Sequence, residues 1–297
     1  MRKAFPAGRG DKQAGDDERR ERRETGWHVM KNILLHIHDD DEHGTRLAVA
    51  LDIARQTNGH LSCLQVTPVE AFGGDPYGGL FGMAALIDTI HDQDKALRIA
   101  TEQRLAGAGV AWDWRCFDGN VVETLIEQAL LADVVVLSQP STSRRGRPPA
   151  AIVGDVVLYT RCPVLMVPQG QRTLDLEGPA VIAWNGSAEA AHALRLAMPV
   201  LKATAGVHIV EVSDEASSVP ASEAAQWLSR HGIAADVHEW PAKGRRISVA
   251  LLHAAGELGA TFMVMGAYGH SRLRETVLGG VTRELIATST VPLLMAH

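Results

Sequence analysis

Short apolar runs separated by amphipathic stretches recur along the chain from residue 32 onward. The first run, residues 32–38, precedes a stretch at 43–57 whose apolar residues fall on or near one face of a helix. Asn58-Gly59 then predicts a left-handed end to that helix, and residues 60–66 predict the next strand. Because the runs are continuously apolar, they are typical of strands that a parallel sheet buries on both faces.

This order of elements occurs twice along the chain. Residues 179–184, 188–204 and 207–212 repeat the first strand, helix and strand. Strands that alternate with helices require right-handed crossovers and form a parallel sheet covered on both faces. The later strands are predicted in pairs, one in each half, at 110–117 and 233–240, 133–137 and 261–265, and 162–168 and 291–296.

The repeat predicts two domains of one architecture. The first covers residues 30–168, the second covers 179–297, and residues 169–178 form a linker. The first domain has about 21 extra residues between its second and third strands, including a glycine-rich segment at 73–82. We interpret this insertion as a surface loop, with a lid or a partner-binding loop as the alternative.

Charge is unevenly distributed over the 297 residues. The formal net charge is −6, but residues 1–29 hold eight basic and six acidic residues, so the remainder carries −8. That sign argues against nucleic acid as the main partner of the folded part. Within residues 1–29, the mixed-charge segment 16–24 has almost nothing to bury, and we expect a disordered tail there.

Composition favours a globular protein of the cytoplasm. Hydrophobic residues make up 46% of the chain and charged residues 22%. No run approaches the ~20 apolar residues of a membrane span, and the N-terminal residues lack the apolar core of a secretory signal. Cys63, Cys116 and Cys162 lie far apart without metal-binding or disulfide spacing, which favours a reducing compartment.

The most specific motif lies near the C-terminus. It reads Gly266-x2-Gly269-x9-Gly279-Gly280, between an apolar run at 262–265 and a helix predicted at 281–286. Glycines let the backbone approach a ligand closely, and the free N–H groups of a helix start bind anions. The sequence therefore predicts a phosphate-binding site at the carboxyl end of this strand.

In these motifs, and in the order of elements over residues 30–297, the chain resembles the universal stress protein family in its tandem two-domain form. Residues 183–187, Ala-Trp-Asn-Gly-Ser, are similar to that family's Val-Asp-Gly-Ser turn, and the glycine motif is similar to its nucleotide-binding signature. The resemblance implies two tandem, open, parallel five-stranded sheets with helices on both faces, the adenine nucleotide alpha hydrolase-like fold.

The resemblance also implies a stress-response regulatory protein that binds ATP or a related adenine nucleotide, with or without Mg²⁺. The family's last strand commonly pairs domains or subunits, so a tandem chain can form a pseudo-dimer within itself, and a homodimer is the alternative. The expected nucleotide contacts are Ala183, Trp184, Asn185, Ser187, Val212, Met265, Gly266, Gly269, His270, Arg272, Gly279, Gly280, Val281 and Thr282.

Two residues of the second half depart from the family pattern. Gly280 stands where the family usually has Ser or Thr, which removes a hydroxyl contact to phosphate, although Thr282 lies half a turn further on. Asn185 stands in place of an aspartate near the adenine and ribose, and its amide can still donate and accept hydrogen bonds. For Arg272, phosphate contact and plain solvent exposure are both open.

The first half has lost every glycine of the signature. Ser138 and Ser141 stand where the second half has Gly266 and Gly269, and Ala150-Ala151 stands opposite Gly279-Gly280. Side chains at these positions keep the backbone from approaching a phosphate. We interpret the first half as non-binding.

No catalytic constellation is visible in the sequence. P-loop, HExxH and GxSxG motifs are missing and no general base is evident, which predicts slow ATP hydrolysis or none. The alternatives to nucleotide binding are a structural or interaction protein of the same fold and, in third place, a weak ATPase.

A cluster of histidines and acids at 36–43 raises the question of a divalent cation. Adjacent carboxylates mostly face water and repel one another. We favour the interpretation as a solvent loop that caps the first helix through Asp41 or a neighbour.

Overall fold

The computed structural model describes residues 30–68, 80–140, 149–212, 219–269 and 280–297, with only the backbone at 80–88 and 149–151. The predicted tail at 1–29 lies outside the described residues. Strands and helices alternate through the first half as β1 Asn32–Ile37, α2 His43–Thr57, β2 His60–Thr67, α3 Leu80–Ala106, β3 Ala111–Asp118, α4 Val121–Gln128, the 3-10 turn Ala129–Leu131, β4 Val134–Ser138, α5 Pro149–Tyr159 and β5 Val164–Val167.

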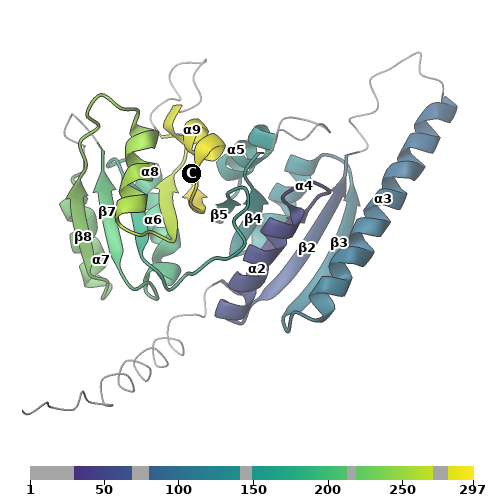
Figure 1. Cartoon of the computed structure of the whole chain (residues 1–297), viewed down its shortest axis with the longest axis horizontal. Helices are drawn as coiled ribbons and strands as arrows, with labels where there is room; N and C mark the ends of the chain where they lie inside the picture. The colour runs from purple at the N-terminus through teal and green to yellow at the C-terminus, as the bar shows by residue number, and fades with distance from the viewer. Residues whose placement is uncertain (1–29, 69–79, 141–148, 213–218, 270–279) are drawn as a thin grey trace, which may run out of the picture.

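The second half repeats this order (Figure 1). Its elements are β6 Ala180–Trp184, α6 Ala188–Leu201, β7 Val207–Glu211, α7 Ala221–Arg230, β8 Ala235–Glu239, α8 Ile247–Glu257, β9 Phe262–Gly266, α9 Gly280–Thr288 and β10 Leu293–Ala296.

The strands form one continuous sheet in the order β3-β2-β1-β4-β5-β10-β9-β6-β7-β8. Within each half, neighbouring strands are parallel, which confirms the predicted α/β fold of two five-stranded parallel units. The units join because β5 and β10 pair antiparallel, with Leu165 opposite Leu294. The last strands therefore pair inside the chain, so the two sheets merge into one.

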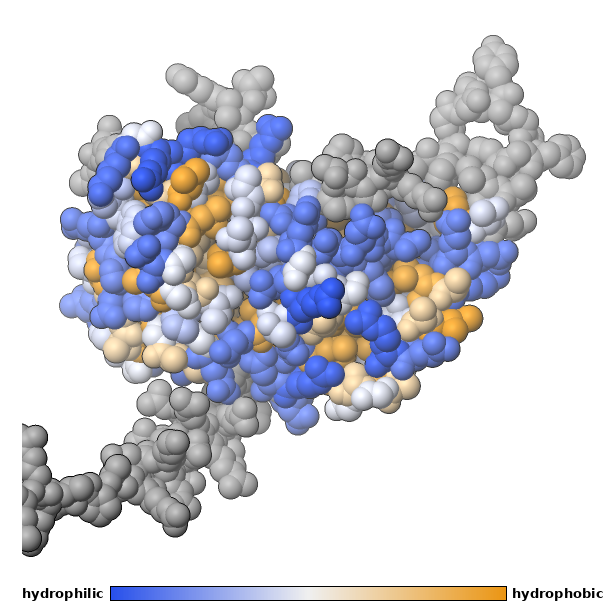
Figure 2. Space-filling model, viewed as in Figure 1, coloured by the Kyte–Doolittle hydropathy of each residue, from blue (hydrophilic) through white to orange (hydrophobic). Residues whose placement is uncertain are grey.

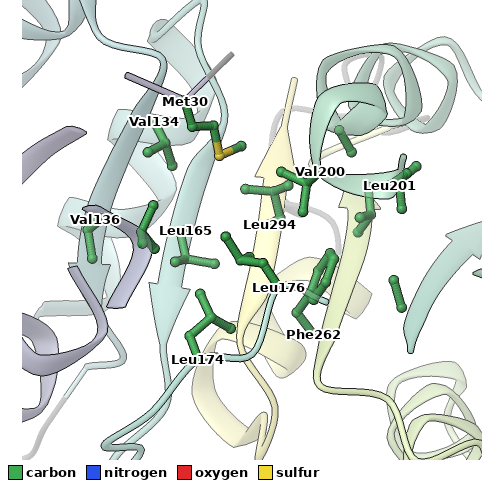
Figure 3. Close-up of a cluster of buried hydrophobic side chains, with 14 of the residues drawn as sticks. Met30, Val134, Val136, Leu165, Leu174, Leu176, Val200, Leu201, Phe262 and Leu294 are labelled. Atoms are coloured by element: carbon green, nitrogen blue, oxygen red, sulfur yellow. The ribbon is translucent and has the colours of Figure 1, made fainter. Parts of the chain in front are cut away.

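Helices cover both faces of this sheet, and each face has its own apolar core. One core packs under α2, α3, α6 and α7, and the other under α4, α5, α8 and α9. Both cores cross from one half to the other, since Leu165 and Leu294 share the first and Met166 and Met295 share the second. The halves therefore bury a common interior (Figure 3).

The predicted linker is part of this interior. Leu174 and Leu176 are buried between the halves. The N–H of Leu174 donates to Asp52 Oδ2 at 3.1 Å, and the Gln56 side chain bonds both Leu174 O, at 2.6 Å, and Leu176 N, at 3.1 Å. Three hydrogen bonds to α2 and two buried leucines hold this segment against the first half.

The extra length of the first half lies partly in a helix. α3 has 27 residues, whereas α7, its counterpart, has 10. Residues 80–82 of the predicted glycine-rich loop already belong to α3, so the loop interpretation is wrong for them. Residues 69–79 lie outside the described part of the chain.

The ends of α2 show how local sequence sets an element. Asn58 is left-handed at φ 49° and closes the helix, as predicted. At the other end Asp41 does not cap the helix, because the adjoining Glu42 occupies the cap position without a side-chain hydrogen bond. Asp40 instead accepts from the Glu42 N–H at 2.9 Å through Oδ1.

Over the described residues, the helices are all too short or too polar to cross a lipid bilayer. The face drawn in Figure 2 shows hydrophilic residues interspersed with smaller apolar areas.

Candidate functional site

A cavity of about 220 Å³ lies at the carboxyl ends of the second half's strands. The order β9-β6-β7 places it at β6, where the crossovers turn to opposite faces and open α/β sheets bind ligands. Its lining consists of Ala183, Trp184, Asn185, Ser187, Val212, Ile247, Leu251, Met265, Gly266, Gly269, Gly280, Val281 and Thr282.

The turn between β6 and α6 forms one wall of the cavity. Asn185 Oδ1 accepts from the Ser187 N–H at 3.2 Å, and Ser187 Oγ accepts from the Ala190 N–H at 3.1 Å. The first bond closes an Asx turn and the second caps α6, so together they fix the turn. The Asn185 amide nitrogen remains as a donor for a ligand.

Gly266, at the end of β9, lies directly against the first turn of α6. A Cβ atom there would lie 2.9 Å from Ala190 Cα and closer still to neighbouring backbone atoms. A Cβ atom on Gly269 would lie 2.9 Å from Glu189 Oε2 and 3.3 Å from Ser187 Oγ. The sequence interpretation assigned both glycines to ligand approach, but Gly266 is also needed for the backbone of α6 to pack on β9.

The first turn of α9 forms the opposite wall. Gly280, Val281 and Thr282 supply backbone N–H groups that have no partner within the helix. These donors and the helix dipole favour an anion at this end. Thr282 Oγ1 accepts from the Tyr268 N–H at 3.2 Å and keeps its own hydroxyl proton to donate.

Helix α8 supplies an apolar wall that the sequence prediction missed. Ile247 and Leu251 line the cavity one helical turn apart. Their spacing is a signal in the sequence, but the same spacing marks every helix that faces a core. Nothing local therefore distinguished these two side chains from ordinary core residues.

The start of α8 is tied to the second turn of α9 beside the cavity. Glu284 Oε2 accepts from Ser248 Oγ at 2.5 Å, and Glu284 Oε1 lies 3.0 Å from Arg246 Nη1. The hydrogen bonds from Ser248 and then Arg246 lower the pKa of Glu284. The carboxylate therefore stays ionised and links the start of α8 to α9.

Eleven of the fourteen predicted contact residues line this one cavity. The other three, His270, Arg272 and Gly279, lie outside the described residues. The described lining contains no charged side chain, so its polar groups are backbone N–H groups, hydroxyls and the Asn185 amide. Such groups bind and orient a ligand, and none of them is a general base.

The corresponding place in the first half is built differently. His36 pairs with Leu64 of β2 as Ala183 pairs with Val210 of β7, so an imidazole stands where the second half has a methyl group. The His36 ring lies parallel to that of His38, with centroids 5.8 Å apart. Side chains therefore occupy the position that the second half leaves as a cavity.

A buried arginine fixes the same end of the first half. Arg46 Nε donates to His36 O at 2.7 Å, and its Nη1 donates to Ser138 Oγ at 2.5 Å and lies 3.1 Å from Asp40 Oδ2. Only 1% of Arg46 is exposed. Ser138, predicted as the counterpart of Gly266, therefore faces a guanidinium group of its own chain. Of the other predicted counterparts, Ser141 lies outside the described residues. Ala150 and Ala151 are described only as backbone of α5.

The acids at 39–42 serve the fold in this arrangement. Asp40 both closes the turn before α2 and pairs with Arg46. Among the residues that the structure describes, no group of three or more His, Cys, Asp or Glu side chains could hold a metal ion.

No family model matches this sequence, and no curated protein matches it. Solved structures do match. A universal stress protein from Archaeoglobus fulgidus is 19% identical, with a TM-score of 0.70, over 91% of this chain and 97% of that chain. A functionally unknown protein from Pseudomonas aeruginosa is 18% identical, with a TM-score of 0.54, over 91% and 93%. The chain therefore has the universal stress protein fold over most of its length, as the resemblance implied.

Proposed function

We propose that the second half binds an adenine nucleotide in the cavity between β6, β9, α8 and α9. The observation that carries this proposal is the meeting, in one small cavity, of apolar walls with the N-terminus of α9. Apolar walls suit a flat base, and helix N–H groups suit a phosphate.

The lining divides naturally between these two parts of a nucleotide. Ile247, Leu251, Val212 and Met265 supply apolar surface for the base. The start of α9 supplies the donors for phosphate, and Asn185 is placed to recognise a polar edge of the base or ribose. An ATP-like ligand is the specific form of the proposal. Mg²⁺ would be held through the nucleotide's own phosphates and water, because the described lining includes no carboxylate.

The proposed role is regulatory, in a stress response, with little or no catalysis. Support comes from the fold shared with the Archaeoglobus fulgidus protein and from a described lining without a general base. Fold alone never specifies chemistry, so the role depends on the binding experiment. The three cysteines are free thiols, which supports a cytoplasmic location.

The first half is proposed not to bind nucleotide. His36 stands at the register position of the cavity-lining Ala183, and Arg46 bridges Asp40 and Ser138. Removing one partner of a buried ion pair typically costs about 3–5 kcal/mol. A ligand would therefore have to displace a strongly held guanidinium group.

Calorimetric titration with ATP, ADP, AMP and adenosine tests the proposal. Ala183→His places in the second half the side chain that the first half has at that register position, and we expect it to abolish saturable binding. Ala287→His, at an exposed alanine later in α9, is the matched control and should bind like the unmodified chain. Binding that survives Ala183→His would contradict the assigned cavity.

A structural or interaction protein is the competing function. It is favoured by Gly266, whose missing side chain makes room for the backbone of α6 and so needs no ligand to explain it. Native mass spectrometry of gently purified protein separates the two functions. Co-purified nucleotide supports binding, whereas a bare chain without saturable binding in the titration supports the competing function.

A further inference from the structure

Tyr268 adopts a backbone conformation that side chains rarely take. Its φ is 60°, in the left-handed region, which is unfavourable for a residue with a side chain. It lies between Gly266 and Gly269, which both line the cavity. Strain of this kind persists only where surrounding contacts enforce it. The contacts of Tyr268 therefore indicate what holds this part of the cavity in place.

Those contacts come from both halves of the chain. The Tyr268 N–H donates to Thr282 Oγ1 in the first turn of α9, at 3.2 Å. The hydroxyl end of the ring lies against Gly154 of α5, in the first half, where an added Cβ atom would overlap the phenolic oxygen and would be 3.4 Å from Tyr268 Cζ. Burial, followed by the nearby Asp155, raises the pKa of Tyr268. One residue thus touches the cavity loop, the anion-binding helix and the other half.

The surrounding elements agree with this arrangement. α5 and α9 contact each other and lie side by side in the centre of the molecule (Figure 1). The residue before Tyr268 is also fixed, because the Ala267 N–H donates to Ala296 O of β10 at 2.8 Å. The two halves differ at these positions, because Pro140 is the repeat counterpart of Tyr268 and Arg283 is that of Gly154. The sequence therefore provides this pair once, with the tyrosine in the second half and the glycine in the first.

We propose that the first half positions the nucleotide cavity of the second, with Gly154 as the seat of the Tyr268 ring. Gly154 and Tyr268 are positioning residues in this inference, which rests on the proposed function. The seated ring holds Tyr268 in its left-handed conformation, and so keeps its N–H bonded to Thr282 at the start of α9. A residue of the first half then helps to shape the binding site of the second.

Gly154→Ala tests the seat, because its methyl group overlaps the Tyr268 hydroxyl. We expect the affinity for adenine nucleotide to fall about tenfold, within the usual range of coupling between sites. Alanine is the better helix former, so the loss would not come from a weakened α5. Tyr268→Phe removes the overlapping oxygen and leaves ring carbon 3.4 Å from the methyl group. The double variant should therefore bind within about twofold of Tyr268→Phe alone.

Gly256→Ala is the matched control, because it lies within α8 and an added Cβ atom would have nothing within 4 Å. We expect it to bind like the unmodified chain. If the unmodified chain binds nucleotide and Gly154→Ala binds it equally well, the inference is overturned and the proposed function stands.

Hydrogen exchange of the ligand-free protein tests the positioning without any nucleotide. The amides of Ala267 and Tyr268 should exchange faster in Gly154→Ala and return to their original rates in the double variant. If the unmodified chain binds no nucleotide, the proposed function is wrong, and the predicted change in nucleotide affinity of Gly154→Ala no longer applies. Faster exchange would then still support the seat, and unchanged exchange would overturn it.

Discussion

Gly280 leaves the start of α9 with backbone donors and no hydroxyl group of its own. An added Cβ atom at this position would have none of the described residues within 4 Å, and the residue is exposed. The missing side chain is therefore not required by packing. Thr282, two residues later, is buried and its oxygen already accepts from Tyr268, so it serves the fold as well as the cavity.

Gly280→Ser should tighten nucleotide binding. The new hydroxyl can donate to a phosphate, and hydrogen bonds to charged groups contribute about 1.5–3 kcal/mol, so we expect an affinity gain of roughly tenfold. Gly280→Ala is the control, because it has the same backbone effect without a donor. Dissociation constants for ATP from calorimetry decide the matter. Equal affinities for the serine and alanine variants would show that no phosphate lies at this position.

Single residues also show which features of the site could be predicted from the sequence and which could not. The glycine motif and the turn at 183–187 predict where the cavity lies, because both restrict the backbone locally. Arg46 is different, since a charged residue within an amphipathic stretch is ordinarily solvent-exposed. Its burial depends on Ser138, which is 92 residues away in the sequence. No local pattern contains that contact.

Strands are the elements that the sequence predicts best. Each predicted strand coincides with an observed one to within two residues at its ends. Burial on both faces selects continuous apolar sequence for the central strands, whereas the edge strands β3 and β8 are largely exposed and carry polar residues. Helix ends are predictable where a cap residue marks them, as at Asn58. Contacts between elements are not. Thus α8 was not recognised as a cavity wall, and the linker was not recognised as part of the core.

Two histidines, His36 near the end of β1 and His43 at the start of α2, predict that acid lowers the stability of the first half. Burial, followed by the charge of Arg46, lowers the pKa of His43 to about 4, and the same two causes lower the pKa of the buried His36. His36 Nε2 and His43 Nδ1 have no hydrogen-bond partner among the described residues. Both imidazoles are therefore neutral in the folded protein at neutral pH, whereas in the unfolded chain they take up protons near pH 6.5.

The unfolding free energy should therefore fall as the pH falls from about 6.5 towards 4, because the unfolded chain binds more protons over that window. His43 alone accounts for about 2 kcal/mol between pH 7 and pH 5. Urea unfolding at both pH values should show a smaller loss for His43→Gln than for the unmodified chain. His231→Gln, at an exposed histidine of the second half, is the control. A loss that His43→Gln leaves unchanged would contradict this assignment.

In the whole molecule, the two repeated halves pair with each other through their last strands. β5 and β10 are the last strands of the two halves, and each covers the edge that the other would expose. Their antiparallel pairing joins the two five-stranded sheets into one. Leu174 and Leu176, between the two halves in sequence, are buried in the core that both halves share. This arrangement lets the second half keep its cavity at the carboxyl ends of β6 and β9, while His36 stands at the corresponding register position of the first half.

Separating the halves should expose that edge. Residues 30–178 alone would present β5, with unpaired backbone groups along an apolar strand, and such edges pair with other strands. We expect this fragment to dimerise or aggregate, because β5 of a second copy can take the antiparallel place of β10. Light scattering after size-exclusion chromatography measures the mass. Adding residues 179–297 should convert the fragment into a 1:1 complex, since β10 restores the native pairing. A fragment that stays monomeric and unfolds cooperatively would mean that the junction contributes little, and the first half would then be an independent domain.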